Sequence, residues 1–138
     1  MIRTLVAIFM GQMAIVLLNG IVRMAVGIYL DIEFSLTGIS YLPGFLWEVL
    51  IVGFSLIYGF VGGIIVSLIS SGDGRVEILG LTLIIASVSL FDYYYLGSSE
   101  PLWYFLINTA LLIAGLFLSY RFMTTNENIL EHKIDHSV

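Results

Sequence analysis

Six polar side chains interrupt segments of the chain that are otherwise apolar, and these are the residues best suited to chemistry. Arg23 is the sharpest feature, because a guanidinium inside an apolar membrane segment costs roughly 2.5 to 3.5 kcal/mol unless it is paired or reaches water. Gln12, Asn19 and Arg23 are spaced by seven and four residues and share one helical face. We expect this face to point at protein or water. The predicted intramembrane polar cluster comprises Gln12, Asn19, Arg23, Glu48, Asp92 and Asn108.

The expected partner of Arg23 is an acidic side chain at a similar depth. Glu48 fits best, and Asp92 is the second candidate. One interpretation is a structural ion pair that holds the first helix to the second, and the other is a polar pocket open to the outer side of the membrane. Asn108 is expected to bond across to Asn19 and Gln12, where hydrogen bonds average only about 0.6 kcal/mol in membranes.

A repeat of small residues follows the second apolar segment. Ser55, Gly59, Gly63 and Ser67 recur every four residues and form one face on which helix backbones can approach closely. This helix-packing ridge is predicted to pack either inside the protein or against another chain, and internal packing is the preferred interpretation.

No catalytic arrangement is recognisable in the apolar segments. They contain no Ser-His-Asp order, no paired carboxylates, no phosphate-binding loop and no metal-ligand cluster, and the chain has no cysteine. His132 and His136 have the four-residue spacing of helical metal ligands, but we expect a solvated, partly disordered tail there. The prediction is a non-catalytic protein without metal or cofactor.

Composition determines the elements that must position these residues. The chain has 138 residues, of which 59% are hydrophobic and 11% charged, whereas soluble domains carry about a quarter charged residues. A water-soluble fold could not bury this much apolar surface. Since lipid offers no hydrogen bonds to exposed backbone, we predict an all-α, integral membrane four-helix bundle.

The spans are predicted at about residues 4–30, 44–70, 76–96 and 102–122, so that residues 1–123 form the membrane domain and 124–138 a polar cytoplasmic tail. Short polar links favour antiparallel neighbours. Arg3, Arg75, Arg121 and Lys133 fall on one side of this arrangement, which the positive-inside rule places in the cytoplasm. Both termini are therefore predicted to be cytoplasmic. The opposite side collects acidic residues and an aromatic belt that includes Trp47, Trp103 and Tyr104.

Several of these features occur together in a known group of proteins. The run Tyr58 to Gly63, the basic turn at Arg75, Gly80, and the segment from Pro101 to Tyr104 resemble small bacterial four-span inner-membrane proteins with a glycine-rich second helix. The resemblance covers about residues 45–122 and implies a multi-pass location in the bacterial cytoplasmic membrane, with no assigned activity. The chain departs from the group after the basic turn, where Val76-Glu77-Ile78 replaces a histidine.

These observations are compatible with more than one function. The leading hypothesis is an accessory or scaffold subunit that packs against other membrane protein subunits of a larger complex. The alternative is a homo-oligomeric small-solute transporter or channel whose polar cluster lines an outward-facing cavity. A sensor with a signalling tail is a third and weaker hypothesis. The expected surroundings are the lipid bilayer, and no nucleic-acid partner is expected.

Overall fold

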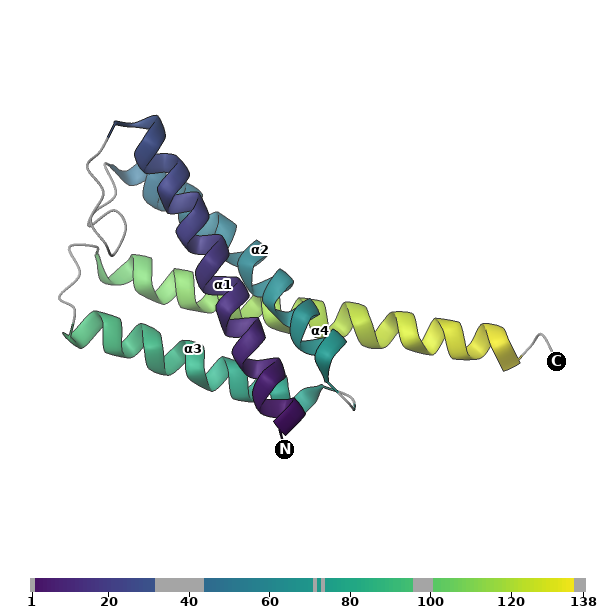
Figure 1. Cartoon of the computed structure of the whole chain (residues 1–138). Coiled ribbons are helices and arrows are strands. Elements are labelled where there is room, and N and C mark those ends of the chain that lie inside the picture. The colour runs from purple at the N-terminus through teal and green to yellow at the C-terminus, as the bar shows by residue number, and fades with distance from the viewer. Residues whose placement is uncertain (1, 32–43, 71, 73, 96–100, 136–138) are drawn as a thin grey trace.

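The described part of the chain folds into four helices, each long and apolar enough to cross a membrane (Figure 1). The computed structural model describes residues 2–31, 44–70, 72, 74–95 and 101–135. The all-helical prediction is confirmed for these residues, and their four long apolar helices have the architecture of a multi-pass membrane protein. The helices are α1 (Ile2–Tyr29), α2 (Phe45–Ile69), α3 (Arg75–Tyr95) and α4 (Leu102–Asp135).

Glycines precede the second and third helices. Gly44 has a φ of 129° and Gly74 a φ of 71°, and glycine adopts this region of backbone space without the clash that a Cβ would cause. The chain can therefore change direction immediately before α2 and before α3.

Helix α2 is the centre of the bundle, with its largest interface against α4 and its second against α1 (Figure 1). A Cβ added to Gly59 would overlap the backbone of Leu112, and one added to Gly63 would overlap the Ser119 side chain. A Cβ added to Gly115 of α4 would likewise overlap the α2 backbone at Leu56 and Phe60. Small residues on both helices thus allow the two backbones to approach closely.

The contact of α2 with α1 uses a different face. A Cβ at Gly62 would lie 2.8 Å from Ile15, and a Cβ at Gly11 would lie 3.2 Å from the Gly62 carbonyl oxygen. Helix α3 packs less extensively, against α4 and α1, through Ile78, Leu81 and Ile85. Much of the surface of α1 and α3 is therefore exposed and apolar.

Helix α4 continues well past the predicted end of the fourth span. It reaches Asp135 and extends beyond the other helices (Figure 1). A partly disordered tail is expected if the segment is an isolated helix, because forming the first helical turn is unfavourable. In the structure the tail continues the fourth span, whose turns are already formed. No glycine or proline lies between Phe122 and Asp135 to stop the helix.

Candidate functional site

Polar side chains from all four helices lie near Arg23, which bonds α1 to α4. The Arg23 guanidinium donates a 2.7 Å hydrogen bond to the Tyr104 hydroxyl of α4 and lies 5.9 Å from the centre of the Tyr104 ring. Arg23 also interacts electrostatically with Asp92 of α3 and Tyr58 of α2. We call Arg23, Tyr58, Asp92 and Tyr104 the polar junction.

The junction lies beside an apolar layer that excludes water. Tyr104 is only 2% exposed and packs with Val26, Ile51 and Val52. A hydrogen bond between a charged donor and a buried phenol is worth more in such surroundings than in water. The geometry therefore favours a structural tie between α1 and α4.

The expected ion pair between Arg23 and Glu48 is not formed among the described residues. Glu48 is half-buried in the first turn of α2, whereas the Arg23 guanidinium donates a hydrogen bond to Tyr104. The second candidate, Asp92, is half-buried and lies within electrostatic reach of Arg23. A phenol and a carboxylate thus accompany the guanidinium in the junction.

A second polar contact lies between α2 and α4. Ser55 is 1% exposed and donates hydrogen bonds to Asn108 Oδ1 and to the Ile51 carbonyl oxygen, the latter at 3.1 Å. Asn108 was expected to bond to Asn19 and Gln12 of α1. It bonds to Ser55 instead, because α4 packs on α2 and not on α1.

The Tyr58 hydroxyl and Gln12 Oε1 are buried and have no hydrogen-bond partner within the described part of the chain. Asn19, the third member of the predicted α1 face, is half-buried. The structure therefore divides the predicted cluster. Arg23 bonds to Tyr104 at the junction, and Asp92 lies within reach of its charge. Asn108 joins α2, and Gln12 lies elsewhere along α1.

Sequence reasoning missed the two tyrosines of the junction. Tyr104 was assigned to the aromatic belt, and Tyr58 was noted only within the glycine-rich run. A signal was present for both, because Tyr104 lies four residues before Asn108 and Tyr58 three residues after Ser55. These spacings place each tyrosine on the same helical face as a buried polar residue.

The helix-packing ridge faces the interior of the protein. Ser55, Gly59 and Gly63 are buried against α4, and half-buried Ser67 donates a 3.0 Å hydrogen bond to the Gly63 carbonyl oxygen. The preferred interpretation, internal packing, agrees with these contacts. A partner protein cannot use this face without displacing α4.

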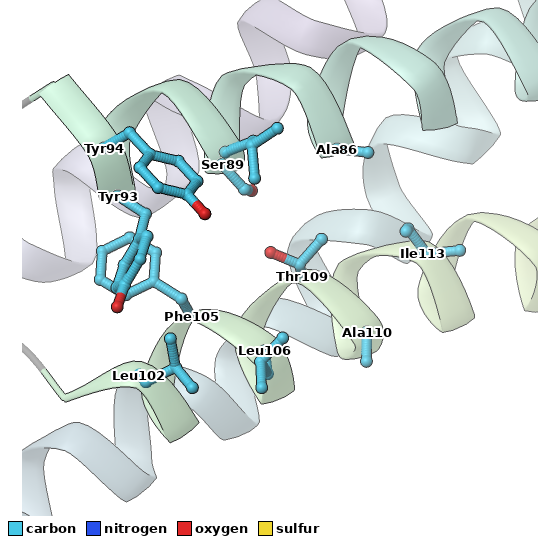
Figure 2. Close-up of a pocket in the computed structure, with 11 residues that line it drawn as sticks. Ala86, Ser89, Tyr93, Tyr94, Leu102, Phe105, Leu106, Thr109, Ala110 and Ile113 are labelled. Atoms are coloured by element: carbon cyan, nitrogen blue, oxygen red, sulfur yellow. The ribbon is translucent and has the colours of Figure 1, made fainter.

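A cavity of about 420 Å³ lies between α3 and α4 (Figure 2). None of the six predicted cluster residues lines it. Its walls are mostly apolar, with hydroxyl groups from Ser89, Thr109, Tyr93 and Tyr94, and the remaining lining includes Ala86, Leu90, Phe105, Leu106, Ala110 and Ile113.

No group of His, Cys, Asp and Glu suited to a metal ion occurs among the residues that the structure describes. Of the two tail histidines, His136 lies outside the described residues, as do the surroundings of the His132 side chain. The resemblance to small bacterial four-span proteins stays a prediction. Comparison with protein-family models, with curated proteins and with solved structures finds no match for this chain.

Proposed function

We propose that this protein is a non-catalytic accessory subunit of a larger membrane assembly, and that it binds its partner through α1. The observation that carries the proposal is an exposed face on α1 with the spacing of a helix-packing seam. Its residues alternate in steps of three and four and are all exposed: Met10, Met13, Leu17, Gly20 and Met24. We call this set the methionine face.

The composition of the methionine face suits a protein partner. Steps of three and four residues keep side chains along one seam between packed helices. The flexible thioether of methionine adapts to irregular partner surfaces. A Cβ at Gly20 would meet nothing within 4 Å, so another helix could approach the α1 backbone closely there. Lipid chains require neither this spacing nor a glycine.

The polar contacts favour a structural role over transport. Arg23 bonds to Tyr104, and Asn108 accepts a bond from Ser55, so these groups hold helices together. A transport path would need such groups to line an open space, and the α3–α4 cavity contains none of them. The transporter hypothesis therefore has less support than the subunit hypothesis.

We further propose antiparallel spans with both termini in the cytoplasm of a bacterial cell. Arg75 at the start of α3 donates a 2.8 Å hydrogen bond to Tyr120, near the end of the apolar part of α4, whereas Tyr93 near the end of α3 contacts Phe105, early in α4. These contacts support opposite directions for α3 and α4. Arg3, Arg75 and Arg121 are exposed, and the positive-inside rule favours the cytoplasm for them.

The test is purification of the tagged protein from its own membranes in native nanodiscs, followed by mass determination and identification of co-migrating proteins. A foreign protein at fixed stoichiometry is the expected result. A pure homo-oligomer would instead favour the transporter hypothesis, and a monomer alone would refute the subunit proposal.

A matched pair of variants locates the interface. Gly20 on α1 and Gly53 on α2 are both exposed helical glycines with nothing within 4 Å of an added Cβ. Both Gly20→Leu and Gly53→Leu should therefore fold and insert normally. Only Gly20→Leu is expected to reduce recovery of the partner. Equal recovery with the two variants would exclude the methionine face as the interface.

A further inference from the structure

The cavity between α3 and α4 extends along half of a membrane span. On α4 it runs from Leu102, the first helical residue, to Ile113, a distance of about 16 Å at the helical rise. On α3 it runs back from Tyr94 to Ala86, about 12 Å. Half of the hydrocarbon core of a bilayer is roughly 15 Å. The cavity therefore has the length of one lipid leaflet.

The chemistry of the cavity changes along its length. The end near the helix termini carries the phenol groups of Tyr93 and Tyr94, and tyrosine is enriched at membrane interfaces. The deep end is formed by Ala86, Ala110 and Ile113. Figure 2 shows the hydroxyl groups of Tyr94 and Thr109 directed toward the space between the helices. Apart from the hydroxyl groups of Ser89 and Thr109, the lining is polar at one end and apolar along the rest, which matches a molecule with one polar end and a long apolar body.

The lining contains no charged side chain. A charged head group would thus gain nothing inside the cavity, whereas an acyl chain would bury its methylene groups against apolar walls on two sides. The volume of about 420 Å³ also lies within the usual range of about 300 to 1,000 Å³ for small-molecule sites.

We infer that the α3–α4 cavity binds one acyl chain of a bilayer phospholipid, with the head group at the end formed by Tyr93 and Tyr94. The chain lies along α4 from the membrane boundary to its centre. Bound there, it fills the space between two helices that contact each other less extensively than α2 contacts α4. This site is separate from the methionine face of α1, so either proposal can fail without the other.

The test compares two substitutions at adjacent positions of α3. Ala86 lines the cavity, whereas Ser87 does not, and both residues are exposed and lie at the same depth. Ala86→Phe should fill the cavity, and Ser87→Phe should leave it open. Each variant and the parent are extracted from phosphatidylethanolamine-rich membranes, exchanged extensively into detergent, and weighed by native mass spectrometry.

The expected result is an equimolar retained phospholipid on the parent and on Ser87→Phe, and loss of that mass from Ala86→Phe. Ala110→Phe, on the opposite wall, should lose it as well, which covers the case in which Ala86→Phe does not fold. Equal lipid retention by the parent and by all folded variants, or no retained lipid on the parent, would overturn the inference.

A crosslinking measurement separates lipid from protein as the occupant. A benzophenone amino acid takes the place of Phe105, a lining residue that already carries a ring; it is irradiated in native membranes, and the adduct is analysed by mass. Addition of a phospholipid mass supports the inference. Addition of a polypeptide, whether a second copy or a foreign helix, contradicts it.

Discussion

Arg23 of α1 and Tyr104 of α4 are joined by a 2.7 Å hydrogen bond, although both helices pack mainly against α2 and α3 and not against each other. The bond is a side-chain bridge that passes beside α2. Its position next to Val26 and Ile51 keeps water away from it. The Tyr104 hydroxyl thus links α4 to α1, two helices whose backbones do not pack against each other.

Removing this phenol should destabilise the protein. Tyr104→Phe keeps the ring near Arg23 but takes away its hydrogen-bond acceptor, and losing one partner of a buried polar contact costs roughly 1 to 3 kcal/mol. We expect a loss of that size in the unfolding free energy, measured by denaturant titration in mixed micelles. Tyr94→Phe is the control, because Tyr94 is 70% exposed. Equal stability of the two variants would contradict a structural role for the bridge.

The close contact of α2 with α4 predicts a sharp difference between two glycines. A Cβ at Gly59 would overlap the Leu112 backbone, whereas a Cβ at Gly53 would meet nothing within 4 Å. Gly59→Ala is therefore expected to lower stability by about 1 to 3 kcal/mol through overpacking. Gly53→Ala should be neutral or slightly stabilising, because alanine favours helix formation over glycine. The same micelle titration measures both, and a neutral Gly59→Ala would show that α4 packs elsewhere.

The contact between Ser55 and Asn108 is best measured by a double-mutant cycle. Ser55→Ala and Asn108→Ala each remove one partner of the same hydrogen bond. Their combined effect should be smaller than the sum of the single effects, with a coupling energy of about 0.6 kcal/mol, the average in membrane helices. Ser87→Ala is the control, since Ser87 bonds only to the Leu83 carbonyl oxygen of its own helix. Strict additivity would mean that the two residues do not interact.

The proposed topology can be tested with single cysteines, because the parent chain has none. Gly72→Cys and Thr125→Cys should react with an impermeant maleimide only after the cytoplasmic side is opened. Phe45→Cys and Pro101→Cys should react in intact cells whose outer membrane is permeable. All four positions are exposed, so accessibility depends on the side of the membrane alone. Labelling of Gly72→Cys and Phe45→Cys from the same side would refute the antiparallel arrangement.

The sequence by itself determined the number and class of the elements. Four apolar segments separated by Pro43-Gly44, Gly72-Asp73-Gly74 and Gly97 to Pro101 could form only helices in lipid, because every backbone polar group must be satisfied within the segment. The small residues from Ser55 to Ser67 likewise predicted a close helix contact. Both conclusions depend on the local spacing of apolar and small residues, which can be recognised without knowing which helices are neighbours.

The tertiary structure decided which helices meet. A polar face on α1 does not reveal whether its partner is Glu48 of α2 or Tyr104 of α4, because both lie at similar depth and the choice depends on how α2 and α4 pack together. Because α2 packs against α4, the helix-packing ridge contacts α4, and Asn108 accepts a hydrogen bond from Ser55. The periodicity of a helix predicts which of its faces is buried. Which helix covers that face depends on the contacts of all four helices together.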